Sequence, residues 1–161
     1  MTSIGQAPDG AEAVVSIERV ECRVERDEDP FPVQHEARAL ASRFGFARRD
    51  ATEIAIAASE LASNVLKYGV RGMVVIEAVH HPTRGLGVRL TAFDEGPPFV
   101  AFEDALRDGC DARGPLDPAA FAGRRGFGTG LGTVQRFTDL CGWAPEARGK
   151  RVWALRFLER P

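Results

Sequence analysis

The sequence predicts an α+β protein, a two-layer sandwich in which one mixed or antiparallel sheet is covered on one face by helices. Three observations support this fold class. Alternating apolar and polar residues mark short strands that follow each other in pairs, as in antiparallel hairpins. Apolar residues at steps of three and four mark helices with one buried face each. The elements occur in the order strand, helix, helix, strand, strand, long loop, helix, strand, strand.

Length and composition favour one soluble domain. The 161 residues are 44% hydrophobic and 27% charged, an ordinary globular composition. We expect a flexible tail at residues 1–12 and a single domain at residues 13–161. The net charge of −2 argues against nucleic-acid binding, and no apolar run approaches the roughly 20 residues of a membrane span. The first residues do not read as a signal peptide. Three widely spaced cysteines fit reduced thiols, so we expect a cytoplasmic protein.

The first strand and the first helix follow the tail. Val20, Cys22 and Val24 alternate with charged residues, which predicts a strand with one solvated face. An apolar stripe at residues 33–44 then predicts a helix, and Gly45 supplies its end.

The stretch from Asp50 to Gly69 predicts the longest helix. Asp50 stands where an N-cap residue is expected and Glu53 follows three residues later, which suggests a capping box. Gly69 provides a stop. One buried stripe is expected from the apolar residues Ile54, Ala58, Leu61, Val65 and Tyr68.

A second stripe of this helix is polar. Glu60, Asn64 and Lys67 follow each other at steps of four and three, so they share one flank beside the buried stripe. A solvated flank with a Glu-to-Lys ion pair is common, and for this helix taken alone we would favour that interpretation.

The next two strands form a predicted hairpin at residues 73–79 and 87–93. The second strand ends in Asp94, which is followed by Gly96 in a Gly- and Pro-rich turn. A carboxylate at a strand end followed by glycine could accept a hydrogen bond from an exocyclic amine such as that of adenine. In isolation, a plain turn is the simpler interpretation.

A loop-like segment at residues 108–125 leads into a glycine-rich run and a helix at residues 133–140. Glycines let the backbone approach an anion, and a following helix points its free N–H groups at the same place. The run lacks the Gly-Lys-Ser/Thr of a P-loop. A last hairpin is expected to turn near Arg148 and Gly149. The candidate phosphate-binding residues are Gly126, Gly128, Thr129, Gly130, Leu131 and Gly132.

Together the three motifs are far more specific than any one alone. In order they read E-L-A-S-N-V-L-K-Y-G, D-E-G-P-P-F and G-F-G-T-G-L-G-T. This constellation resembles the N, G1 and G2 boxes of the GHKL (Bergerat-fold) ATP-binding superfamily. Within it, S-E-L-A-S-N, E-D-A-L-R-D-G and G-L-G-T-V-Q-R-F are most similar to the bacterial anti-sigma-factor serine/threonine kinases, closest to the stressosome switch-protein kinase. The likeness covers Val20 to Leu158.

The resemblance implies an ATP- and Mg²⁺-dependent kinase that phosphorylates a serine or threonine of a STAS-domain (anti-anti-sigma) protein in a sigma-factor partner-switching pathway. It assigns the role of general base to Glu60. Asn64 matches the Mg²⁺ ligand, since neutral oxygen ligands suit this ion. Lys67 would face the phosphates, Asp94 and Gly96 would hold the adenine, and the glycine run would enclose the phosphate tail. The resemblance also allows a sigma factor or a PP2C-type phosphatase as a partner, and the oligomeric state stays open, a homodimer included.

Two alternatives are kept. Pro98 replaces the second glycine of the family's D-x-G-x-G motif and removes an N–H, and the loop before the glycine run is long. Both favour a non-catalytic anti-sigma or phosphatase-activating binding module that uses nucleotide only as a conformational ligand. The motif N-V-L-K-Y also suggests a histidine-kinase catalytic domain, but the chain is too short to add the helical domain that carries a phospho-acceptor histidine.

Overall fold

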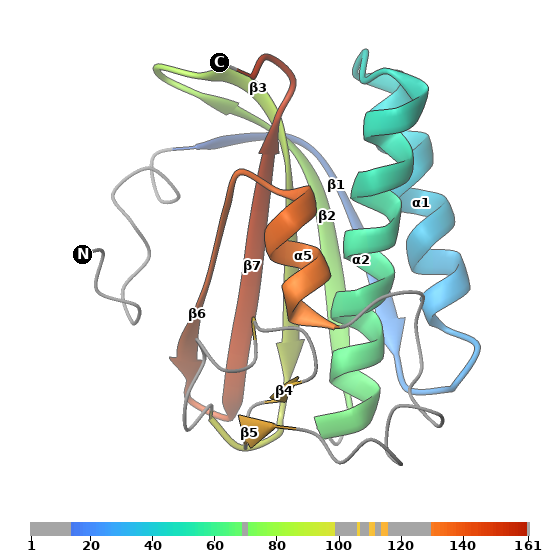
Figure 1. Ribbon diagram of the computed structural model, residues 1–161, viewed down its shortest axis with the longest axis vertical. Helices are drawn as coiled ribbons and strands as arrows, with labels where there is room; N and C mark the ends of the chain where they lie inside the picture. The colour runs from blue at the N-terminus through green and yellow to red at the C-terminus, as the bar shows by residue number, and fades with distance from the viewer. Residues whose placement is uncertain are drawn as a thin grey trace.

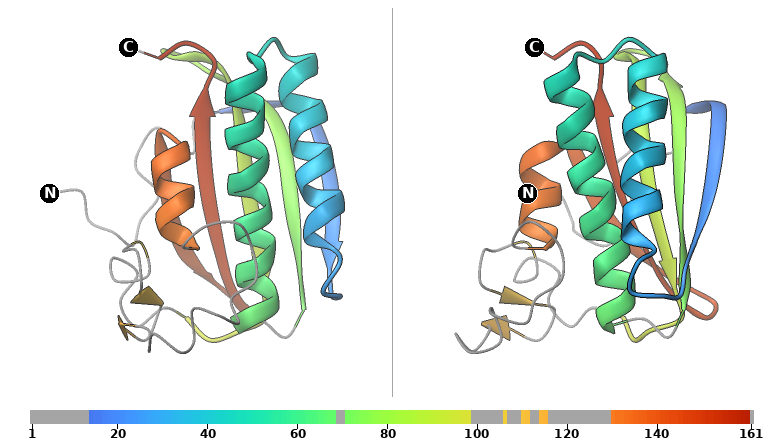
Figure 2. Two further views of the ribbon diagram at one scale, coloured as in Figure 1. Left: turned by 45° about the vertical axis from the view of Figure 1, so that its right-hand side comes forward. Right: turned by 90° about the vertical axis from the view of Figure 1, so that its right-hand side faces the viewer.

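The computed structural model describes residues 14–68, 71–98, 106, 110–111, 114–115 and 130–160. Its centre is a five-stranded sheet in the order β1-β2-β3-β7-β6 with every neighbouring pair antiparallel. Three helices cover one face of this sheet (Figures 1 and 2). This arrangement confirms the predicted two-layer α+β fold and selects its antiparallel form. The main strands are β1 (Val15–Val24), β2 (Gly72–His81), β3 (Gly85–Asp94), β6 (Leu140–Glu146) and β7 (Gly149–Phe157).

The helices within the described residues are α1 (Pro30–Arg43), α2 (Arg48–Tyr68) and α5 (Leu131–Phe137). Two strands of two residues each, β4 (Cys110–Asp111) and β5 (Gly114–Pro115), pair separately from the main sheet. Over the residues that the structure describes, the element order agrees with the sequence prediction apart from this short pair. No helix in the described part of the chain is both long enough and apolar enough to cross a membrane.

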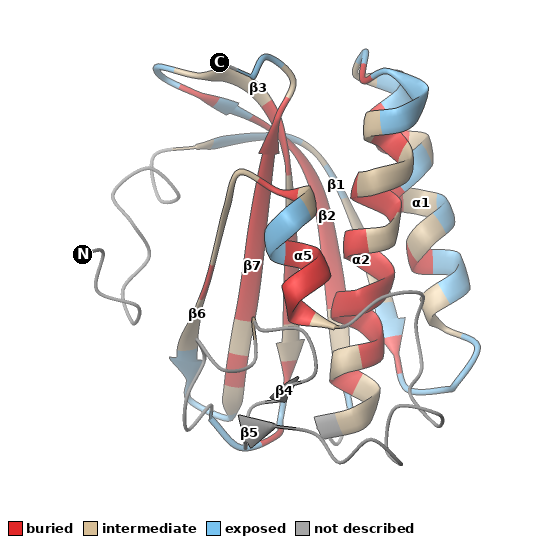
Figure 3. Ribbon diagram, in the orientation of Figure 1, coloured by how far each residue is buried: buried red, intermediate tan, exposed pale blue. Residues whose placement is uncertain are grey.

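The main core lies between the helices and the sheet. In Figure 3 the buried residues line the inner side of α2 and the central strands. The predicted stripe of α2 supplies one wall, and alternate residues of the central strands supply the other, because successive side chains of a strand point to opposite faces. Fully buried members of this core include Ile54, Ala58, Leu61, Val74, Ile76 and Ala154.

The start of α2 differs from the prediction. The helix begins at Arg48, so Asp50 lies within its first turn and is not the N-cap residue. Asp50 and Glu53 instead bind the buried guanidinium of Arg156 on β7. The capping-box interpretation is therefore wrong. Both carboxylates pair with Arg156, which is distant in the sequence. Local residue spacing contains no information about such a partner.

The other predicted elements need smaller changes. β1 begins five residues before Val20, and α1 begins at Pro30, which suits a first helical position. Gly45 ends α1 with φ at +93°, as expected for a left-handed helix stop. α5 ends at Phe137, and β6 begins at Leu140. The predicted tail at residues 1–12 lies outside the described residues.

Candidate nucleotide-binding site

The polar flank of α2 contributes three side chains to the candidate site. Glu60 is 1% exposed, whereas Asn64 and Lys67 are half-buried nearer the end of the helix. α2 can place them because its apolar side is held against the sheet, α1 and α5. Burial of Glu60 argues against the solvated-flank interpretation for this residue, since a carboxylate is seldom buried without a structural or chemical role.

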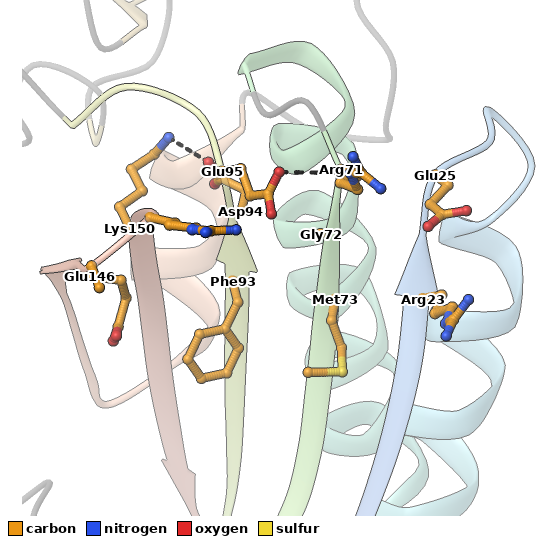
Figure 4. A pocket seen from close by; sticks show the side chains of 12 residues that line it. Arg23, Glu25, Arg71, Gly72, Met73, Phe93, Asp94, Glu95, Glu146 and Lys150 are labelled. Atoms are coloured by element: carbon orange, nitrogen blue, oxygen red, sulfur yellow. Dashed lines mark hydrogen bonds and ion pairs between the residues drawn. The ribbon is translucent and has the colours of Figure 1, made fainter.

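Asp94 lies at the end of β3, where the sheet meets the turn that follows. Its side chain is 1% exposed. The backbone N–H of Gly96 donates to Asp94 Oδ1 at 2.7 Å. Lys150, directly opposite on β7, donates from Nζ to the same oxygen at 2.9 Å (Figure 4). A backbone donor and a buried cation therefore both bind the same oxygen, Oδ1, of the carboxylate.

The second oxygen of Asp94 tests whether the site fits an adenine nucleotide. Asp94 Oδ2 is buried and has no hydrogen-bond partner. An unsatisfied buried carboxylate oxygen costs folding free energy, and an exocyclic amine could supply the missing donor. The residues present at this position therefore fit an aminopurine base.

Two glycines let other strands approach the end of β3 closely. A Cβ on Gly149 would lie 1.9 Å from the backbone oxygen of Asp94, and a Cβ on Gly72 would lie 2.1 Å from the oxygen of Phe93. Gly149 also has φ at +107°, a conformation that L side chains rarely adopt. The position of Asp94 thus depends on glycine in both flanking strands.

The glycine run is only partly described. Gly130 precedes α5 with φ at +76°, and both Leu131 and Gly132 are buried. α5 packs against α2, so the end of the run lies on the same helical layer as the polar flank. Gly126, Gly128 and Thr129 lie outside the described residues.

The described residues include no cluster of three or more His, Cys, Asp or Glu that could hold a metal. Mg²⁺ does not need such a cluster, because it keeps several waters and binds through one or two protein groups plus phosphate oxygens. The amide oxygen of Asn64 is a group of the kind that Mg²⁺ accepts.

A cavity of about 540 Å³ lies at the same end of the sheet. Arg23, Met73 and Phe93 line it, and these residues alternate with core residues, so the cavity opens on the face that the helices do not cover (Figure 4). The sheet separates this cavity from Asn64 and Lys67. It is therefore distinct from the predicted nucleotide site, although Asp94 and Lys150 contribute to its wall.

Sequence reasoning missed Lys150 and Gly149 as parts of this site. One signal was available: Lys67 and Lys150 are the only lysines among the 21 lysine and arginine residues of the chain. The pairing of Lys150 with Asp94 depends on strand register, which the sequence pattern did not define.

Comparisons with known proteins agree with this architecture. Residues 25–156 match the family described as histidine kinase-like ATPase domain. The chain is 30% identical over 138 residues to the serine/threonine-protein kinase RsbT of Bacillus subtilis (strain 168), a match that covers 84% of this chain and 94% of the relative. The solved RsbU and RsbW domains of Rv1364c from Mycobacterium tuberculosis superpose with a TM-score of 0.57 at 17% identity. That superposition covers 90% of this chain but 34% of the solved one, so it supports the fold alone.

Proposed function

Because the chain belongs to the histidine kinase-like ATPase domain family, we propose that it is an ATP- and Mg²⁺-dependent serine/threonine protein kinase. Its proposed substrate is a STAS-domain (anti-anti-sigma) protein of a bacterial sigma-factor partner-switching pathway. The 30% identity to the RsbT kinase over most of both chains supports this choice within the family.

One structural observation carries the kinase proposal beyond nucleotide binding. α2 holds the buried carboxylate of Glu60 one turn before Asn64, on a helix packed against the sheet. A base next to the metal ligand is where an incoming hydroxyl would lose its proton during phosphoryl transfer. The alternative of a module that only binds nucleotide assigns no chemical role to this carboxylate.

Each residue has a distinct proposed task. Asp94 Oδ2 accepts a hydrogen bond from the exocyclic amine of the base. Lys67 faces the phosphates as a point charge. Asn64 would hold Mg²⁺, which would neutralise part of the negative charge of the phosphates. Glu60 takes the proton of the attacking serine or threonine hydroxyl. We propose Gly96, and residues 126 and 128–132 of the glycine run, as backbone contacts to the base and the phosphates.

The test is a phosphotransfer assay with labelled ATP, Mg²⁺ and a STAS-domain protein from the same organism. We expect label on a serine or threonine of the STAS protein. A Glu60→Gln variant should have a Kd for ATP within about threefold of the wild-type value. Its rate of phosphoryl transfer should be lower by roughly 10²-fold or more. Clean nucleotide binding by the wild type without transfer to any STAS protein would reject the kinase proposal.

Pro98 favours a second candidate function, that of a non-catalytic binding module. This exposed residue has no N–H to offer a nucleotide in the turn after Asp94. Under this alternative, the chain controls a sigma factor or a PP2C-type phosphatase by contact alone. The Glu60→Ala variant separates the two proposals, because partner regulation that survives this change unaltered would favour the binding module.

A further inference from the structure

We propose that Lys150 is the positioning residue for base recognition: it clamps the Asp94 carboxylate and the turn that follows, so that Asp94 Oδ2 is presented to the amine of a 6-aminopurine nucleotide. This inference rests on the proposed function and names the residue that makes its base site selective. Lys150 itself is not proposed to touch the base.

The ion pair between Lys150 and Asp94 is almost completely buried. Its side chains are 2% and 1% exposed, and Nζ lies 2.9 Å from Oδ1. Removing two charges from water is costly, so a buried pair persists only with good geometry and additional hydrogen bonds. The N–H of Gly96 provides one such bond to the same oxygen at 2.7 Å. Oδ1 is therefore fully engaged by the protein, which fixes the rotation of the carboxylate.

Lys150 also holds the turn after the carboxylate. Its Nζ donates to the backbone oxygen of Pro97 at 2.9 Å. The next residue, Pro98, lacks an N–H, so the turn cannot use that position to make a backbone hydrogen bond of its own. A single ammonium thus connects β7 to both the beginning and the end of the segment from Asp94 to Pro97. An ammonium has three donors and can serve two acceptors at once.

The clamp leaves one atom for the ligand. Asp94 Oδ2 is buried and accepts no hydrogen bond, and it is held in place because Oδ1 is fixed. A 6-aminopurine presents an N–H donor to such an oxygen. A 6-oxopurine presents an acceptor there, which a carboxylate oxygen repels, and an unsubstituted purine presents neither. The geometry therefore predicts selection at the 6-position of the base, provided that Lys150 keeps the carboxylate from turning.

Lysine suits this position better than arginine would. Its ammonium is a compact charge on a flexible stem, whereas guanidinium is a planar fork that needs more room. Lys150 lies beside Gly149, whose backbone is already in close contact with Asp94. Lys150 is one of only two lysines in a chain that otherwise uses arginine for its permanent positive charges. A lysine at this buried position agrees with the limited space beside Asp94.

The experiment measures base discrimination by titration calorimetry on the full chain. The two ligands are Mg²⁺-ATP and the Mg²⁺ complex of purine riboside triphosphate, which differs only by lacking the 6-amine. The proteins are wild type, Lys150→Met and the control Arg151→Met, which changes the next residue of the same strand. Thermal unfolding shows which variants are folded.

We expect wild type to prefer ATP by about tenfold, the value of one hydrogen bond to a charged group. Lys150→Met should reduce this preference to roughly threefold or less, while its Kd for purine riboside triphosphate changes little. Arg151→Met should retain the wild-type preference. If Lys150 has a purely structural role, Lys150→Met would instead weaken the binding of both nucleotides equally and leave the ratio of their Kd values unchanged.

The outcomes separate this inference from the proposed function. If wild type binds neither nucleotide, the proposed function fails. If wild type prefers ATP and folded Lys150→Met keeps that preference, the positioning role is wrong and the kinase proposal stands.

If Lys150→Met does not fold, the double variant Lys150→Met/Asp94→Asn avoids an unpaired buried charge and is compared with Asp94→Asn. Action through the Asp94 carboxylate predicts that these two proteins have the same ratio of the Kd values for the two nucleotides, because neither has a carboxylate at position 94 to orient. A ratio that differs between the two proteins would overturn the inference.

Discussion

The guanidinium of Arg156 on β7 donates to the Glu53 carboxylate on α2 at 2.9 Å, and this ion pair joins the sheet to the helix that carries the candidate catalytic residues. The same guanidinium donates to Asp50 at 2.5 Å and to the backbone oxygen of Phe137, the last residue of α5, at 2.7 Å. Arg156 is 2% exposed. One buried cation therefore fixes the start of α2 and the end of α5 relative to the sheet.

Replacing this cation should destabilise the whole fold. We expect Arg156→Met to lower the free energy of unfolding by roughly 3 kcal/mol, because it removes the buried cation that binds Asp50 and Glu53 and a donor to the Phe137 carbonyl. Arg151→Met is the matched control: its pair with Glu146 is more than one-third exposed on both sides and should cost about 1 kcal/mol or less. Urea denaturation of both variants measures the difference, and equal losses would contradict the anchoring role of Arg156.

The same ion pair predicts a pH dependence of stability. Burial raises the pKa of Glu53, but hydrogen bonds from Arg156 and Arg49 outweigh burial and leave the pKa below its usual value of 4.5. A lowered folded-state pKa means that its stabilisation is complete at neutral pH and is lost as the pH falls from about 4.5 through the folded pKa.

A Glu53→Gln variant tests this sign. It should be less stable than wild type at pH 7, and the two stability curves should converge as the pH falls below 4.5, because protonated Glu53 resembles glutamine. Glu159→Gln changes an exposed carboxylate outside this network and should follow wild type at every pH. A gap between Glu53→Gln and wild type that stayed constant from pH 7 to pH 3 would show that the pair does not depend on the charge of Glu53.

The fold was predictable because its signals are local and repeated. The stripe that includes Ile54, Leu61 and Val65 gave α2 to within two residues at its start, and strand alternation gave the central hairpin. Tertiary partners were not predictable in this way. Arg156 lies more than 100 residues after Asp50 in the sequence, so a local pattern assigned the carboxylate to a helix cap when a distant cation binds it.

The sequence predicts only those parts of the candidate site whose residues lie close together along the chain. Glu60, Asn64 and Lys67 share a flank by helical spacing alone. Lys150 is part of the site only because β3 and β7 pair in the register that sets it opposite Asp94. The sequence pattern does not define which residues of two distant strands pair. The role of Gly149 likewise follows only from its close approach to the Asp94 backbone in the folded protein.

Gly149 should be intolerant of even the smallest side chain. A Cβ there would lie 1.9 Å from the Asp94 oxygen and 2.7 Å from the Cα of Glu95, so Gly149→Ala must displace the end of β3. Gly45→Ala is a matched control, because Gly45 also has positive φ, at +93°, but has no atom within 4 Å of the added Cβ.

We expect Gly45→Ala to cost about 1 kcal/mol from backbone strain alone and to leave nucleotide affinity unchanged. Gly149→Ala should cost roughly 2–3 kcal/mol more and weaken ATP binding, because its clash moves Asp94. Thermal unfolding and ATP titration measure the two effects. Equal behaviour of the two variants would mean that the β6–β7 turn relaxes without disturbing Asp94.

Asn64 provides the test of metal-dependent nucleotide binding. If its amide oxygen holds Mg²⁺ against the phosphates, Asn64→Ala should weaken ATP binding by roughly tenfold or more in the presence of Mg²⁺ and have little effect without the metal. Lys67→Met is the contrast, because a phosphate-facing charge contributes with or without Mg²⁺. Calorimetric titrations of wild type and both variants, each with and without Mg²⁺, compare the two roles. Wild-type binding that depends on Mg²⁺ and survives unchanged in Asn64→Ala would remove Asn64 from the metal site, whereas wild type that binds no ATP in either condition would remove the nucleotide site itself.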